Sequence, residues 1–149
     1  PRSAMDLSAC SNSTLAKAIW RAALSTRRPR CLVFACDHCG REEVAKEVRA
    51  AGLRNVRFAR IPCGARVDPA QVLEALASGL DLVVVLMCEP GTCGYEDAVL
   101  HADVKLGLLA ACLEELGLRD RFYVLRCTPQ EASEIAKTII ELAGGSERH

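Results

Sequence analysis

The apolar run Leu80–Met87 (L-D-L-V-V-V-L-M) constrains the fold more than any other stretch of this sequence. Its length, its β-branched residues and the turn residues around it are typical of a strand that is buried on both faces. The segment that follows, Met87–Tyr95 (M-C-E-P-G-T-C-G-Y), carries Cys88 and Cys93 on a loop rich in turn residues. Two thiols are therefore expected at the carboxyl end of a central strand, where open parallel sheets bind ligands.

Apolar strand-like segments alternate with helical patterns along most of the chain. The predicted strands are Cys31–Ala35, Val56–Ile61, Leu82–Met87 and Phe122–Cys127. The predicted helices are Arg41–Ala51, Asp68–Ser78, Glu96–Leu116 and Thr128–Leu142, and an interruption of the third near His101–Asp103 is an alternative. This alternation predicts an α/β fold with a four-stranded parallel sheet and helices on both faces. The expected strand order is 2-1-3-4, as in flavodoxin-like folds, with a switch point between the first and third strands.

The helix boundaries rest on capping patterns. Asp68 and Gln71 can form a capping box around Pro69, and Thr128 and Glu131 are expected to form a second one. The domain organisation that follows is an N-terminal extension over residues 1–30, a domain over residues 31–145 and a tail over residues 146–149. The extension contains a predicted amphipathic helix, 14–24, and a basic linker.

Composition excludes several classes of function. The 149 residues carry no net charge, so there is no basic footprint for nucleic acid. No apolar stretch reaches the roughly 20 residues of a membrane-spanning helix, so no membrane insertion is expected. The chain has nine cysteines, an odd count, and 50% hydrophobic residues, which is enough for a core without disulfides. This usage favours a reducing, cytoplasmic location with cysteines kept for metal or redox chemistry.

Five cysteines fall in loops that follow the first three strands. They are Cys36 and Cys39, Cys63, and Cys88 and Cys93. Because the carboxyl ends of parallel strands share one edge of the sheet, all five thiols are expected at that edge. Each loop leads into a helix, whose N-terminal N–H groups and partial positive charge favour thiolate. Four glycines in these loops let the backbone approach such a site closely, namely Gly40, Gly64, Gly91 and Gly94.

Three kinds of chemistry fit these thiols. A 2Fe–2S cluster needs two thiolates for each iron, and two cysteine pairs from neighbouring loops supply them. A tetrahedral zinc site in a protein-interaction module uses the same ligands. A thiol–disulfide pair at Cys36 and Cys39 matches the C-x-x-C pattern of thioredoxin-like proteins, but leaves the other three cysteines unexplained.

The other cysteines have structural interpretations. Cys31 begins its strand at the opposite edge and is expected to be a small buried residue. Cys112, in the middle of a helix, is expected in the core. Cys127 ends the fourth strand, so it reaches the ligand-binding edge one strand further out.

The cysteine loops resemble a known family, the delta subunit of methyl-viologen-reducing hydrogenase, an iron–sulfur protein associated with heterodisulfide reductase. The similar segments are F-A-C-D-H-C-G (Phe34–Gly40), I-P-C-G-A-R-V-D-P (Ile61–Pro69), C-E-P-G-T-C-G-Y (Cys88–Tyr95) and L-E-E-L-G-L (Leu113–Leu118). The order and spacing of the five cysteines agree, over about Cys31–Leu142. The sequence departs from the family at Glu89 and Gly94, where histidines are usual, and at Glu96–Ala98.

The resemblance implies one 2Fe–2S cluster and a role in electron relay rather than catalysis. In such complexes the subunit passes electrons from a hydrogenase or formate dehydrogenase to the flavin subunit of heterodisulfide reductase. The candidate ligands that the resemblance implies are Cys36, Cys39, Cys63, Cys88 and Cys93, which is one more than the four ligand sites of the cluster. Cys63 is the expected spare thiol or substitute ligand, because it has no second cysteine on its loop.

Overall fold

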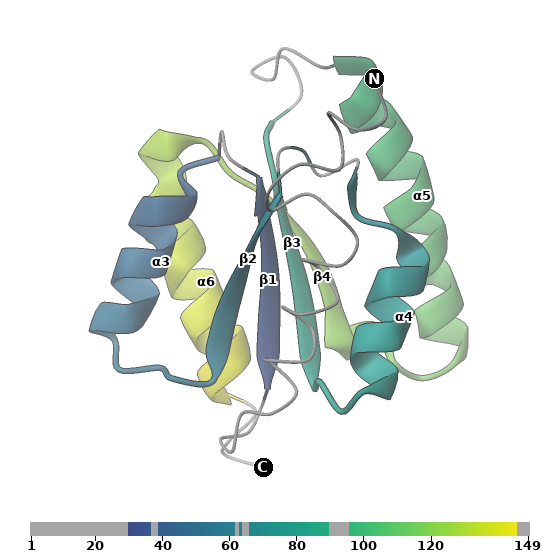
Figure 1. Ribbon diagram of the computed structural model, residues 1–149, viewed down its shortest axis with the longest axis horizontal. Helices are drawn as coiled ribbons and strands as arrows, with labels where there is room; N and C mark the ends of the chain where they lie inside the picture. Colours follow the sequence, from purple (N-terminus) through teal and green to yellow (C-terminus); the bar gives the residue numbers. More distant parts are fainter. Residues whose placement is uncertain (1–29, 37–38, 62, 64–65, 90–95, 146–149) are drawn as a thin grey trace, which may run out of the picture.

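The computed structural model describes residues 30–36, 39–61, 63, 66–89 and 96–145. These residues form a four-stranded sheet between two layers of helices (Figure 1). The strands are β1 (Cys31–Cys36), β2 (Val56–Ile61), β3 (Leu82–Met87) and β4 (Phe122–Arg126). All neighbouring strands run parallel in the order β2-β1-β3-β4, which confirms the predicted topology.

Burial follows the position of each strand in the sheet. Every residue of β1 and β3, the two inner strands, is buried, whereas β2 and β4 at the edges are only partly buried. The register pairs Ala35 of β1 with Leu86 of β3, and Met87 of β3 with Arg126 of β4. The carboxyl ends of β1, β3 and β4 therefore lie at the same level, and the segments that leave them begin side by side.

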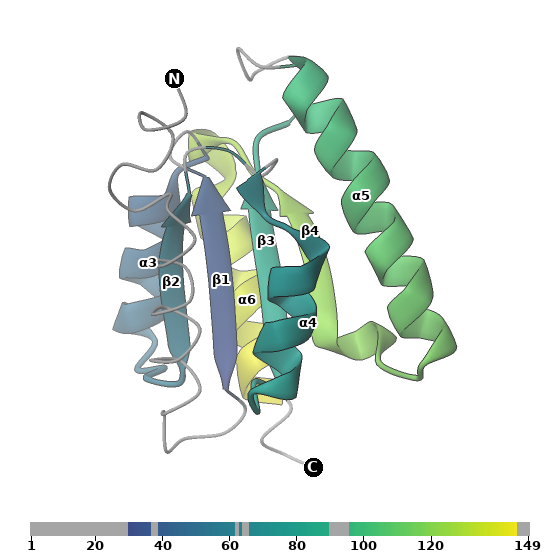
Figure 2. The ribbon, with the colours of Figure 1, turned by 45° about the vertical axis from the view of Figure 1, so that its right-hand side comes forward.

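Two helices cover each face of the sheet. The helices α3 (Arg41–Ala50) and α6 (Ala132–Gly145) pack together on one face, and α4 (Pro69–Ala77) and α5 (Glu96–Glu115) lie on the other (Figures 1 and 2). The buried side of α5 carries Ala102, Leu106, Leu109 and Leu113 at helical spacing. This arrangement follows from right-handed crossovers on either side of a switch point between β1 and β3.

The helix boundaries confirm one predicted cap and correct another. Asp68 and Gln71 form the expected capping box, and the Asp68 carboxylate accepts from the Ala70 N–H at 2.8 Å. The segment after β4 is different, because Pro129–Glu131 forms a 3-10 turn before α6 begins. Thr128 Oγ1 donates to the Glu131 carboxylate at 2.8 Å instead of capping a backbone N–H, so the second capping box was wrong.

Two further predictions from the sequence concern helices, and their outcomes differ. Helix α5 runs without a break through His101–Asp103, so the alternative of an interruption there was wrong. The N-terminal helix expected over residues 14–24 lies outside the described residues. Within the described part of the chain, no helix is long and apolar enough to cross a membrane.

Cys31, the buried thiol at the start of β1, is expected to make the stability of the fold depend on pH. It is 1% exposed, and burial raises its pKa to about 12 from a value of 9.0. A raised pKa in the folded state gives stability that is complete below pH 9 and is lost as the pH rises towards 12. Between pH 8 and pH 10.5 the unfolding free energy should fall by about 2 kcal/mol more in the wild type than in Cys31→Ala. Urea titrations across this pH range measure the difference, and parallel pH profiles for the two proteins would contradict it.

Candidate metal centre

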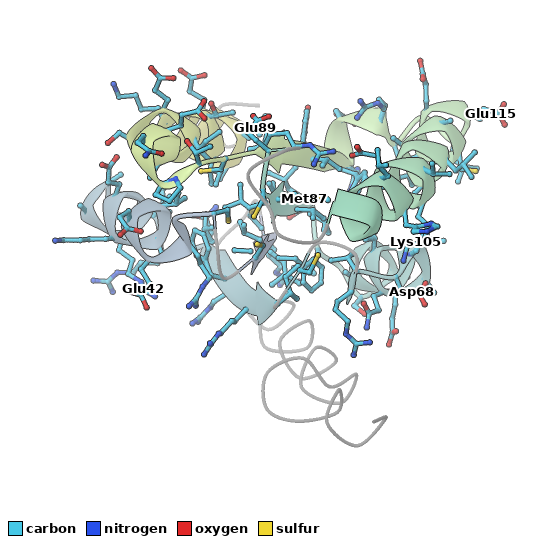
Figure 3. All side chains as sticks on the ribbon, turned by 90° about the horizontal axis from the view of Figure 1, so that it is seen from above. Glu42, Asp68, Met87, Glu89, Lys105 and Glu115 are labelled. Carbon is cyan, nitrogen blue, oxygen red and sulfur yellow. The ribbon has the colours of Figure 1, made fainter. Side chains whose placement is uncertain are left out.

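The carboxyl edge of the sheet gathers thiols that are far apart in the sequence. Figure 3 looks down on this edge, with Met87 at the end of β3 near the centre and Glu89 beyond it, and sulfur atoms lie around this central position. Cys36 is the last residue of β1 and Cys88 is the first residue after β3. Because β1 and β3 are hydrogen-bonded neighbours, both cysteines leave the sheet at the switch point.

The Cys36 and Cys88 sulfurs are 3.3 Å apart, and both residues are buried. A disulfide would hold its sulfurs about 2.05 Å apart, so the two thiols are not bonded. Two thiolates on one tetrahedral metal at about 2.3 Å would have sulfurs roughly 3.8 Å apart. The pair therefore needs to open by only a fraction of an ångström to hold one metal ion, and soft thiolates are the donors that iron–sulfur clusters and zinc take.

Cys39 is fully buried beside this pair. Its thiol donates to the Cys36 carbonyl oxygen at 3.1 Å. Hydrogen bonding with the Cys36 side chain raises the pKa of Cys39 most strongly, burial adds to the effect, and the charges of Cys36, Cys127 and Cys88 raise it further. A thiol whose pKa is raised in this way remains protonated until a cation replaces its proton. The cluster of thiols is thus better suited to a metal than to free thiolate chemistry.

Cys127 is the buried thiol that sequence analysis left outside the candidate set. Its backbone N–H donates to the Met87 carbonyl at 2.9 Å, which extends the β3–β4 ladder and places Cys127 beside Cys88. Its thiol donates to the Thr128 carbonyl at 3.2 Å. Burial raises its pKa to about 11, and the charge of Glu131 adds to this. The sequence signal was present, because Cys127 also follows a strand of the same sheet.

Gly40 brings the loop of Cys39 against the loop of Cys127. It has φ +78°, a left-handed conformation, and a Cβ at this position would lie 3.0 Å from the Pro129 Cα. Glycine is the residue that tolerates both conditions. The contact joins the start of α3 to the turn before α6, so it fixes the two cysteine loops relative to each other.

The remaining predicted residues are less tightly placed. Cys63, after β2, is half-buried, and Cys93 lies outside the described residues. Cys112 is exposed on α5, so its expected place in the core was wrong, whereas Cys31 is buried as expected.

Within the described residues, no three side chains of cysteine, histidine, aspartate or glutamate are grouped to hold one metal ion. The Cys36–Cys88 pair is thus the closest approach to a metal site in that part of the chain.

Comparison with known proteins identifies the family of this domain. The profile of the family described as "Methyl-viologen-reducing hydrogenase, delta subunit" matches residues 31–145. The chain is 34% identical over 92 residues to an iron–sulfur subunit of the F420-non-reducing hydrogenase of Archaeoglobus profundus, covering 60% of this chain and 67% of that protein. It is 32% identical over 114 residues to the corresponding iron–sulfur subunit of the F420-non-reducing hydrogenase vhu of Methanopyrus kandleri, covering 74% and 86%.

A second kind of relative contains the same region within a longer polypeptide. This relative belongs to the Ferredoxin/F(420)H(2)-dependent CoB-CoM heterodisulfide reductase of Methanosarcina acetivorans, and it is 31% identical over 116 residues. The match covers 76% of this chain and 15% of that protein. The family match spans the whole sheet and all four strand-end cysteine segments, and therefore the chain belongs to the family of the methyl-viologen-reducing hydrogenase delta subunit.

Proposed function

We propose that the chain is an electron-transfer subunit that carries one 2Fe–2S cluster at the carboxyl edge of its sheet. The observation that carries this proposal is the 3.3 Å approach of the Cys36 and Cys88 sulfurs across the switch point between β1 and β3. The proposed ligands are Cys36, Cys39, Cys88 and Cys93, with Cys63 as a spare or substitute thiol. The iron–sulfur subunits among its relatives support the cofactor class.

The protein's part in this chemistry is to hold the ligands and to limit access of water. When bound, the cluster would accept one electron and release it. Cys36, Cys39 and Cys88 are buried, so they provide a site of low polarity, while Cys63, which follows the edge strand β2, is partly open to solvent. Loops at a sheet edge place such a centre close to the protein surface, where another protein can exchange electrons with it. Relatives that are named iron–sulfur subunits of a hydrogenase support a relay role, and we infer that the chain is not catalytic on its own.

Anaerobic purification with metal and sulfide analysis tests the proposed cofactor. Visible absorption from a 2Fe–2S cluster, an EPR signal after reduction, and equal amounts of iron and sulfide are the expected results. The alternative of a zinc-stabilised interaction module predicts a colourless protein with one zinc and no sulfide. The alternative of a Cys36–Cys39 dithiol predicts a metal-free protein that forms a disulfide between these two residues.

We propose that the electron acceptor is a heterodisulfide-reductase-like flavin subunit, and that the donor is a hydrogenase or formate dehydrogenase type subunit. The support is the relative in which this region forms part of a longer heterodisulfide reductase polypeptide. We infer a cytoplasmic location from the odd count of nine cysteines in the sequence, because thiols persist in reducing compartments. The domain boundaries at residues 30 and 145 also remain a prediction.

Helix α5 offers the surface on which we expect the flavin subunit to dock. It exposes four large apolar side chains at spacings of four or eight residues, with exposed Cys112 in the same row. They are Leu100 (60% exposed), Val104 (63%), Leu108 (64%) and Leu116 (67%). Side chains spaced by four residues form a ridge that packs into the groove of another helix. The ridge starts at the end of α5 near the cysteine edge (Figure 1), so a protein docked along it would reach the proposed cluster.

The double variant Val104→Asp/Leu108→Asp should therefore weaken binding of the flavin subunit at least about tenfold, because it puts charge into the centre of an apolar contact. The matched control is Leu73→Asp on α4, another exposed apolar residue (45% exposed) that is outside the ridge. Isothermal titration of the anaerobic subunits measures both Kd values. Unchanged binding by the double variant would exclude this ridge as the docking surface.

A further inference from the structure

Arg126 connects the segment that leaves β3 to helix α5. It is the last residue of β4, and its Nη1 donates to the Cys88 carbonyl oxygen at 3.0 Å. The side chain is 23% exposed, so the guanidinium lies largely within the protein. The backbone unit that it holds belongs to a proposed cluster ligand. A change at Arg126 therefore affects both the position of Cys88 and the charge near its sulfur.

Asp103 of α5 neutralises this arginine. Its carboxylate forms an ion pair with Arg126 Nη2 and is 40% exposed. Asp103 and Arg126 also border a cavity of about 310 Å³ between α5 and β4, together with Arg119, Phe122 and Leu106. Arg119 is at the other end of β4 and donates to the Phe122 carbonyl at 3.0 Å, away from the cysteines. Of the two arginines that line this cavity, Arg126 is the one that contacts the segment of Cys88.

Acidic groups lie near the same edge. The charges of Glu131, Glu43 and Glu89 all raise the pKa of Cys127, so the field around the thiols contains negative charge. A 2Fe–2S cluster with four thiolate ligands is itself anionic, and a reduced cluster carries one more negative charge. A cation held beside the Cys88 peptide stabilises the reduced state more than the oxidised state. An anion at the same distance has the opposite effect.

We propose that Arg126 and Asp103 form a charge pair that sets the reduction potential of the cluster, with Arg126 positioning the Cys88 peptide and Asp103 limiting the effect of its charge. This inference rests on the proposed function, because it needs a cluster at this edge. Arg126 and Asp103 are not proposed ligands of the cluster, so the inference concerns residues near the iron and not those that bind it. The pair acts through the partly buried guanidinium, where solvent screening is weaker than at an open surface.

The experiment is a redox titration of the anaerobic holoprotein, followed by the EPR signal of the reduced cluster. Arg126→Gln leaves Asp103 unpaired, so the ratio of reduced to oxidised cluster at a fixed potential should fall about tenfold, which equals a shift of about −59 mV for one electron. Asp103→Asn leaves the arginine unpaired and should shift the potential in the positive direction. The double variant restores neutrality and should return towards the wild-type potential.

Arg121→Gln is the matched control, because Arg121 is an exposed arginine in the turn before β4, at the opposite end of that strand from Cys88. It should leave the potential unchanged. Shifts of the same sign in both single variants, or no shift in either, would overturn the inference while leaving the cluster assignment intact. Absence of any cluster in the wild-type protein would instead refute the proposed function, so the two failures are distinguishable.

Discussion

Replacing Cys36 with serine is expected to remove the cluster from this protein. Its sulfur is 3.3 Å from that of Cys88, and serine keeps the size of the side chain but replaces the soft thiolate that iron requires. Iron and sulfide content after anaerobic purification should fall at least about tenfold, because even partners that only orient a metal ligand are worth that much. The visible absorption of the cluster should be lost together with the metal.

The matched control for this experiment is Cys112→Ser. Cys112 is exposed on α5 and belongs to the outer surface rather than to the cysteine edge. Its replacement should leave the spectrum and the iron content at the wild-type level. Far-UV circular dichroism checks that the Cys36→Ser variant retains its fold. A folded Cys36→Ser protein with a wild-type cluster spectrum would rule out Cys36 as a ligand.

Replacing Gly40 with alanine is expected to have the largest effect on stability of any glycine substitution in the described chain. A left-handed alanine costs about 1–2 kcal/mol, and its Cβ would lie 3.0 Å from the Pro129 backbone, which cannot move aside easily. The unfolding free energy should therefore fall by about 2–4 kcal/mol. Cluster content should fall as well, because the same contact fixes the loops of Cys39 and Cys127 relative to each other.

Two other glycines separate the components of this effect. Gly52 has φ +81° with nothing near a Cβ, so Gly52→Ala should cost only the backbone strain, about 1–2 kcal/mol. Gly107 lies within α5 with open space around it, so Gly107→Ala should stabilise the protein by about 0.5–1 kcal/mol. Urea denaturation of the three variants measures these differences. A loss at Gly40 no larger than that at Gly52 would show that the Pro129 contact is unimportant.

The sequence was sufficient for the topology because its local patterns are strong. The apolar run over Leu82–Met87 is long enough to indicate a strand buried on both faces, and the structure buries every residue of it. Turn and capping residues then set the boundaries of α4 within one residue. The start of α6 could not be read in the same way, because Thr128 has two competing partners and prefers the Glu131 side chain.

Burial around α5 was harder to predict. The helix is apolar on two sides, with Leu106 and Leu113 facing the sheet and Leu100 and Leu108 exposed. Hydrophobicity alone does not say which row packs on the sheet, and for this reason Cys112 was assigned to the wrong side. The packing of α5 against the sheet decides the question, and this packing is a property of the assembled protein.

In the candidate site, too, the positions of the cysteines along the sequence could be predicted, whereas contacts between different strands could not. The position of the cysteines after the strands predicted that their thiols share one edge of the sheet. This prediction did not depend on how the side chains pack. The 3.3 Å approach of the Cys36 and Cys88 sulfurs joins two loops that are far apart in the sequence, and it follows from the neighbouring positions of β1 and β3. The contact of Arg126 with the Cys88 carbonyl joins residues 38 positions apart and depends on the β3–β4 register, which no sequence pattern reveals.

Diffraction from anaerobic crystals at the iron absorption edge tests most directly whether thiols from separate strands bind iron together. The expected result is an anomalous peak for two irons at the carboxyl edge of the sheet, with the sulfurs of Cys36 and Cys88 each about 2.3 Å from iron. Crystals in which iron lies elsewhere, or in which these two sulfurs bind no metal while the protein contains its full iron, would contradict the account.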